Sequence, residues 1–256
     1  MKNIENKKKV CSDWFKALRN QICQEIQGFE GNKAKFKKQK WNRSQNNNLG
    51  GGEMGILRGK VFEKAGVNIS TVFGPIPKQL KGKIPGSKNT KKFWASGISV
   101  VIHPYSPKIP AVHMNTRFIV TDKAWFGGGM DITPSKLDSR ESKEIAKIFH
   151  KNIKKVCDEY KKGSYLKFKK WCDEYFYLPH REESRGLGGI FYDYLSSGNW
   201  DQDLEFTQNV GRTFIKSFSQ IVKMTKNLKW SAKDKEIQYL RRSRYTEFNL
   251  LYDRGT

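Results

Sequence analysis

The chain has 256 residues and a formal net charge of +24, with 49 Lys and Arg against 25 Asp and Glu. This length suits one large domain with a substantial core, and no run approaches the ~20 apolar residues that a membrane span needs. The N-terminus, MKNIENKKKV, lacks the apolar segment of a signal peptide, so we expect a cytoplasmic protein with no membrane partner.

The positive charge is spread along the whole chain. A strongly basic protein raises the hypothesis of nucleic-acid binding, because each Lys or Arg that neutralises a phosphate releases counterions. Here Lys occurs in every segment and does not form one stripe, which is typical of a solvated surface. We therefore do not expect nucleic acid as a partner, although a positive field would attract a polyanionic ligand.

The N-terminal third predicts a helix followed by short strands. Ser12 or Asp13 suits the N-cap of the helix, whose apolar residues share one face: Trp14, Leu18, Ile22 and Ile26. Residues 30–52 are basic, rich in Asn and Gln and closed by three glycines, which predicts a mobile connection or an extended edge. Short strands are expected at 59–63 and 67–73, and a basic loop at 78–92.

Two apolar runs between residues 97 and 120 predict an antiparallel hairpin. Three prolines lie in the connection from Pro104 to Pro110, where they suit a turn but not a central strand. By the two-residue period of strands, one face of the hairpin carries Ser99, His103, His113, Asn115 and Arg117. The other face carries Val100, Ile102, Val112, Met114, Thr116 and Phe118.

The polar face of this hairpin has two interpretations. Antiparallel strands commonly turn a polar face to water, so it can be an ordinary solvated surface. Against this, neither strand contains a Lys in a Lys-rich chain, and two of the four His of the protein lie here. We therefore interpret the hairpin as the candidate floor of a binding site.

Three consecutive glycines, Gly127 to Gly129, follow the hairpin and precede Asp131. They let the backbone approach a flat ligand closely; the alternative is a wide bulge or turn.

The second half of the chain predicts helices and two further strands. Asp138 and Glu141 resemble a capping box for a helix to Tyr160, and a second helix is expected at 165–177. A charged loop at 181–189, a strand at 190–195, a long helix capped by Asp201 and a last strand at 245–251 follow. This irregular interleaving predicts an α+β fold in a single domain over residues 1–256, with a large, mainly antiparallel sheet covered by helices on both faces.

Long strings of this sequence resemble the oxygen-dependent coproporphyrinogen-III oxidase family. They are VHMNTRF, WFGGGMDITP, KKWCDEYFYLPHREESRGLGGIF, RYTEFNLLYDRGT and, upstream, GGGEMGILRGKVFEKAGVNISTVFG, and together they extend from about Trp14 to Thr256. The resemblance implies an enzyme, an oxidoreductase of porphyrin and haem biosynthesis. Its reaction is the oxidative decarboxylation of two propionates of coproporphyrinogen III to vinyl groups by O₂, which gives protoporphyrinogen IX.

The resemblance also implies roles for single residues. His113 matches the proposed proton donor, Asp131 the carboxylate that takes the pyrrole N–H proton at the centre of the macrocycle, and Arg117 a third catalytic residue that holds a propionate. Ser99 and the segment Asn115, Thr116 and Arg117 match substrate contacts. This chemistry is reasonable, because Arg binds carboxylates through paired N–H groups and His exchanges protons near neutral pH.

A divalent metal is a further implication of the resemblance. All four His match positions that the family has been proposed to use as ligands: His103, His113, His150 and His180. The sequence lacks the H-E-x-x-H and C-x-x-C patterns that make a metal prediction strong, and propionate binding or structural hydrogen bonds are the alternatives. We treat the four as ligands only if a metal is bound, and expect no required cofactor beyond O₂.

The end of the chain departs from the family pattern. The family continues past YDRGT into a segment with a GGR substrate contact and an apolar helix at the dimer interface, whereas this sequence stops at Thr256. We therefore expect a C-terminally truncated domain, which forms a homodimer if that segment is not needed. The alternative hypothesis is an inactive homologue that binds tetrapyrroles or nucleic acid.

Overall fold

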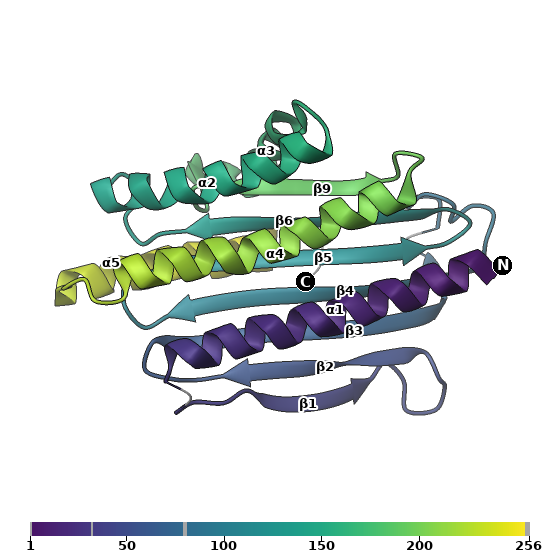
Figure 1. The fold of residues 1–256 in the computed structure, drawn as a ribbon, viewed down its shortest axis with the longest axis horizontal. Coiled ribbons are helices and arrows are strands. Elements are labelled where there is room, and N and C mark those ends of the chain that lie inside the picture. Colours follow the sequence, from purple (N-terminus) through teal and green to yellow (C-terminus); the bar gives the residue numbers. More distant parts are fainter. Residues whose placement is uncertain (1, 32, 79–80, 254–256) are drawn as a thin grey trace.

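The computed structural model describes residues 2–31, 33–78 and 81–253. An antiparallel sheet with the strand order β1-β2-β3-β4-β5-β6-β9 forms its centre (Figure 1). The strands are β1 (Lys37–Asn42), β2 (Gly50–Leu57), β3 (Phe62–Pro75), β4 (Lys92–Pro104), β5 (Ala111–Val120), β6 (Ala124–Thr133) and β9 (Gly189–Leu195). The predicted α+β class with a large antiparallel sheet is confirmed.

Helices lie on both faces of this sheet. In Figure 1, α1 (Lys2–Phe29) and α4 (Trp200–Thr225) cross in front of the sheet, and α5 (Ala232–Leu251) lies behind it. Two further helices, α2 (Arg140–Tyr160) and α3 (Ser164–Tyr175), lie at the β9 edge, where α2 packs on α4 and α3 packs on β9. Within the described residues, no helix is long and apolar enough to cross a membrane.

The face of the sheet under α1 and α4 forms the hydrophobic core, and we call it the core face. Alternate strand residues such as Val100 and Met114 point into it and are 0% exposed. The two helices approach each other closely at Gly211 of α4, where an added Cβ would lie 2.5 Å from Leu18 Cδ2 of α1. Glycine at this position therefore sets the separation of the two helices.

The opposite face, which we call the polar face, carries the residues that the hairpin prediction brought together. Residues directly opposite each other in an antiparallel pair share a face. Ser99 of β4 pairs with Asn115 of β5, and His113 of β5 pairs with Asp131 of β6. The predicted hairpin and its two faces are confirmed.

The three glycines Gly127 to Gly129 lie inside β6 and not in a turn after it. The pairing of β6 with β9 shifts register between Phe126 and Gly128. This irregularity agrees with the alternative interpretation of the glycines, a bulge. Upstream, the strand predicted at 67–73 and the last two residues of the one predicted at 59–63 belong to a single strand, β3, while residues 59–61 precede it. Residues 37–42 form the extended edge strand β1.

The predicted start of the first helix is wrong. It begins at Lys2 and not at Ser12 or Asp13, because the Lys-rich residues before the apolar stripe are good helix formers and extend it toward the N-terminus.

Two further predicted caps are displaced along the chain. Helix α2 is capped by Ser139 in place of Asp138, and α4 by Asn199 in place of Asp201. In both, the side-chain oxygen of the residue before the first helical turn accepts a backbone N–H, which is the geometry that an N-cap requires.

The strand predicted at 245–251 is also wrong, because these residues form the C-terminal half of α5. The helix starts at a capping box, in which Ser231 N donates to Asp234 Oδ2 at 2.9 Å and Asp234 N donates to Ser231 Oγ at 3.3 Å. Its buried residues Gln238, Tyr245 and Phe248 are spaced by seven and three, a helical period. Residues 254–256, which include Thr256, lie outside the described part of the chain.

We expect Gly211→Ala to lower the free energy of unfolding by about 1–3 kcal/mol, the usual cost of overpacking a core, because the new methyl would collide with Leu18. Gly28, near the end of α1, has nothing within 4 Å of its Cβ position, so Gly28→Ala should raise the same quantity by up to ~1 kcal/mol. Urea denaturation measures the free energy of unfolding of both variants. An equal rise in the two would contradict the close approach of α1 and α4.

Candidate functional site

A hydrogen-bonded pair, His113 and Asp131, lies at the centre of the polar face. The two residues are directly opposite on β5 and β6, and His113 Nδ1 lies 2.8 Å from Asp131 Oδ1. The other ring nitrogen, Nε2, lies 3.3 Å from Asn115 Nδ2. The Asp131 side chain is 4% exposed and that of His113 is 16% exposed, so the ring, and not the carboxylate, faces outward.

Arg185 holds the other oxygen of the Asp131 carboxylate. It lies just after β8 (Glu183–Ser184), and its Nη2 donates to Asp131 Oδ2. The guanidinium is packed among three aromatic rings, at 3.7 Å from the centroid of Phe176, 4.5 Å from Tyr245 and 5.1 Å from Phe248. Arg185 is only 2% exposed, so the pair it forms with Asp131 is a buried ion pair.

These neighbours keep Asp131 ionised. Burial by itself would raise the pKa of the carboxyl, but the charge of Arg185 and the hydrogen bond to His113 outweigh it, so the pKa lies below its ordinary value. Both carboxylate oxygens are therefore occupied by donors, and the group is buried behind the His113 ring. A direct transfer of a substrate proton to Asp131, which the family resemblance implies, does not fit this geometry.

Around the pair, the polar face carries two rows of paired residues across β3 to β6. One row of paired residues is Asn68, Ser99, Asn115 and Gly129, and the next is Ser70, Gly97, Arg117 and Gly127. Most of these side chains are short or absent. Four strands at their usual spacing of about 4.8 Å give this floor a width of roughly 14 Å between the outer strand axes, which suits a broad ligand.

Arg117 stands above this floor. Its Nη2 donates to Asp193 Oδ2 at 2.8 Å, and the Arg117 side chain is 34% exposed. A Cβ at Gly127 would lie 2.4 Å from Asp193 Oδ1 and 3.0 Å from Arg117 Nε. The absence of a side chain at Gly127 thus gives the ion pair its space.

The other predicted substrate contacts lie on different faces of the sheet. Ser99 is exposed on the polar face, whereas the side chain of Thr116 is on the core face and 0% exposed. Because the sheet separates it from the floor, the Thr116 side chain cannot contact a ligand that binds beside His113.

Two of the remaining histidines have separate surroundings. The ring of His103 lies edge-on to Tyr245 at 5.2 Å between centroids. His150, on α2, has Nε2 at 2.9 Å from the carbonyl oxygen of Leu187 and Nδ1 at 3.0 Å from the hydroxyl of Tyr165.

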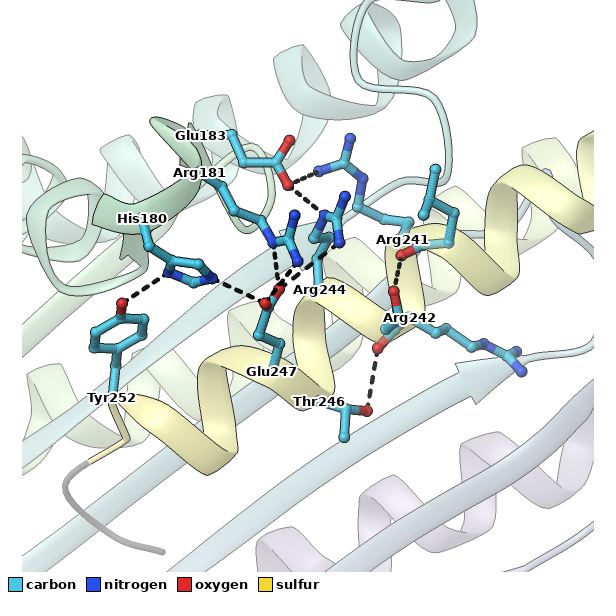
Figure 2. Close-up of polar contacts among 11 residues, drawn as sticks. His180, Arg181, Glu183, Arg241, Arg242, Arg244, Thr246, Glu247 and Tyr252 are labelled. Atoms are coloured by element: carbon cyan, nitrogen blue, oxygen red, sulfur yellow. Dashed lines mark hydrogen bonds and ion pairs between the residues drawn. The ribbon is translucent and has the colours of Figure 1, made fainter.

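The fourth histidine, His180, belongs to an ion network between α5 and the hairpin of β7 (Tyr177–Leu178) and β8. Figure 2 shows its ring between Tyr252 and Glu247, with Nδ1 at 2.7 Å from the Tyr252 hydroxyl and Nε2 at 2.8 Å from Glu247 Oε1. Within the described residues, no group of three or more His, Cys, Asp or Glu side chains could hold a metal ion. The described structure therefore does not gather the four predicted histidines into one ligand set.

The network in Figure 2 ties the hairpin to α5 through several charged groups. Arg181 donates from Nε to Glu247 Oε2 at 2.7 Å and from Nη2 to Glu247 Oε1 at 2.8 Å. Arg244 Nε lies 2.9 Å from Glu183 Oε1. These contacts hold α5 over the part of the polar face where Arg185 lies.

Sequence reasoning missed Arg185, Asp193 and the aromatic rings around Arg185. Arg185 was inside the charged loop at 181–189, but nothing local distinguishes it from Arg181, which faces Glu247. Asp193 lies within the strand predicted at 190–195, and because Tyr192 beside it is buried, the alternation of strand residues puts Asp193 on the side of the sheet opposite the core. Only this alternation could have indicated it.

Comparisons with known proteins give a consistent result. A profile of the coproporphyrinogen III oxidase family matches residues 10–256. Proteins named oxygen-dependent coproporphyrinogen-III oxidase are similar over nearly the whole chain. The one from Rickettsia rickettsii (strain Sheila Smith) is 52% identical over 262 aligned residues, which cover 99% of this chain and 91% of the relative. Those from Rickettsia africae and Rickettsia bellii (strain RML369-C) are 51% and 52% identical, with coverage of 99% and 98% of this chain and 91% of each relative.

The surroundings of His103 predict a pH dependence of stability. Burial and, to a smaller extent, the charge of Arg242 lower the pKa of His103 to about 4, from an ordinary value near 6.5. Between these two pH values, His103 binds a proton in the unfolded state but not in the folded state. The free energy of unfolding is therefore highest above pH ~6.5 and falls by up to about 3 kcal/mol toward pH 4. Urea denaturation of the parent and of His103→Gln across this pH range measures how the free energy of unfolding of each depends on pH. An equal dependence in the two proteins would show that the ring is not held neutral.

Proposed function

Since the chain belongs to the coproporphyrinogen III oxidase family, we propose that it is an oxidoreductase of haem biosynthesis. It converts two propionates of coproporphyrinogen III to vinyl groups with O₂, and gives protoporphyrinogen IX. The observation that carries this proposal is the similarity over 99% of the chain to proteins named oxygen-dependent coproporphyrinogen-III oxidase. The same similarity favours this function over a tetrapyrrole- or nucleic-acid-binding role.

The polar face supports the binding of such a substrate. The short side chains of the floor would let a macrocycle approach the strands, and the Arg117 guanidinium stands at its side, where it can hold a propionate by charge-assisted hydrogen bonds. Asn115 and Ser99 share this face and add directional contacts. The proposed substrate contacts are therefore Ser99, Asn115 and Arg117, without the side chain of Thr116.

The chemistry requires proton transfer beside the floor. Each propionate loses CO₂ and one hydrogen from the neighbouring carbon, and the two electrons left over pass to O₂. We assign the proton exchange to Nε2 of His113, because it is the ring nitrogen away from Asp131. Asp131 then works through His113: it fixes the Nδ1–H tautomer and stabilises the ring when it carries a positive charge. No step is assigned to a metal.

Other features stay predictions from the sequence. A cytoplasmic location, a homodimer and a single domain over residues 1–256 are proposed on the sequence analysis alone. Size-exclusion chromatography with light scattering tests the dimer.

We expect His113→Gln to lower kcat by roughly 10²–10⁴-fold, the usual effect of losing an acid–base group. The assay supplies coproporphyrinogen III under air and follows protoporphyrin fluorescence after oxidation of the product. His150→Gln is the matched control, since that ring contacts Leu187 and Tyr165 and lies away from the floor. Turnover of His113→Gln at the parent rate would remove His113 from the mechanism, and a parent without product would contradict the function itself.

A second expectation concerns Arg117, for which Lys keeps the charge but not the paired N–H donors. Arg117→Lys should raise KM roughly tenfold with little change in kcat, the effect of about one charge-assisted hydrogen bond. Gly127→Ala should act in the same direction, because its Cβ would displace Arg117 and Asp193. A fall in kcat at constant KM in both variants would argue against propionate binding by Arg117.

A further inference from the structure

We propose that Arg185 is a positioning residue for this reaction, which acts through Asp131 on the orientation and tautomer of His113, and that α5 holds Arg185 in place for this purpose. The expected effect of Arg185 on turnover rests on the proposed function. The coupling of the three side chains is a property of the fold that is measured independently.

The three side chains form a continuous chain of contacts. His113 Nδ1 meets Oδ1 of Asp131, and Arg185 Nη2 meets Oδ2 of the same carboxylate. Because each oxygen has its own donor, the carboxylate plane is fixed, and so is the direction from which it accepts the Nδ1 hydrogen of His113. Without Arg185, the carboxylate would be free to rotate, or would take up a proton and become a donor itself.

The burial of Arg185 is difficult to explain by stability alone. A buried ion pair loses hydration energy that its attraction often does not recover, and a well-packed apolar replacement is frequently as stable. Arg185 is 2% exposed, and its Nε is a buried donor without a hydrogen-bond partner among the described residues. The buried Arg185 guanidinium loses hydration energy, and it contacts Asp131, which contacts the proposed catalytic His113. Its burial is therefore better explained by its effect on that histidine.

Helix α5 builds the enclosure around this guanidinium. It supplies Tyr245 and Phe248, while Phe176 comes from the segment before β7 and accepts a hydrogen bond from the backbone N of Arg185 at 3.0 Å. The faces of aromatic rings attract a cation and exclude water. The ion network of Figure 2 fastens α5 to the hairpin two residues before Arg185, at Glu183.

A matched pair of variants tests the proposal. Arg185→Met removes the charge but keeps an unbranched apolar side chain. Arg19→Met is the control, because Arg19 forms a largely buried ion pair with Glu53, between α1 and β2, away from the polar face. Loss of stability alone should be similar in both. Arg185→Lys is the conservative variant, which keeps the charge without the planar fork.

The direct readout is the ¹⁵N spectrum of the histidine rings, which is tractable because the chain has four His and each is assigned by its His→Gln variant. In the parent, we expect His113 as a single tautomer with the hydrogen on Nδ1. In Arg185→Met the His113 pattern should change, and in Arg19→Met it should not. An unchanged His113 pattern in folded Arg185→Met overturns the proposal.

Turnover gives the second readout. Arg185→Met should lower kcat roughly 10- to 100-fold, the size of effect seen for groups that orient a functional histidine, with KM nearly constant, and Arg185→Lys should recover part of it. Equal kcat in Arg185→Met and Arg19→Met contradicts the positioning role. If Arg185→Met does not fold, Arg185→Gln takes its place, since a parent-like His113 spectrum and kcat in that uncharged variant would also contradict the proposal. A parent without turnover contradicts the proposed function, while the spectra still decide the coupling of the three side chains.

Discussion

The charge of the Asp131 carboxylate is the constraint on which the architecture of the site depends. A carboxylate on a side chain that is 4% exposed, in the middle of a sheet, needs partners for both oxygens. One partner, His113, comes from the neighbouring strand, and the other, Arg185, comes from the distant hairpin. Burying Arg185 in turn requires ring faces from α5, so the position of a C-terminal helix follows from one acidic residue on β6.

The two faces of the sheet carry side chains of very different size on the same strands. The core face is filled by large residues such as Phe118 and Phe126, whose ring centroids are 4.7 Å apart. The polar face carries Gly97, Gly127 and Gly129 at paired positions, which leaves an even surface at the cost of strand stability. Two of the three glycines in β6, Gly127 and Gly129, therefore keep the polar face even, while the backbone of β6 still pairs with β5 and β9.

How far the sequence predicts this arrangement depends on the range of each contact. The hairpin of β4 and β5 has a short connection and a clear two-residue period, so the shared face of Ser99, His113 and Asn115 followed from local pattern. Arg185 is 54 residues from Asp131, and no local period links them. The segment 245–251 alternates like a strand, yet Tyr245 and Phe248 also fit one helix face, and only the distant Arg185 and the capping box at Ser231 decide between the two.

The order of the strands has a consequence for how the protein folds. Strands β1 to β6 are neighbours in both sequence and space, so each of these pairings joins consecutive strands, whereas β9 joins β6 only after α2 and α3 have intervened. Contacts between nearby residues form at lower entropic cost than distant ones. His113 and Asp131, 18 residues apart, are thus expected to meet early, while the carboxylate is still hydrated. Its dehydration is then a late event, which coincides with the docking of the C-terminal helix.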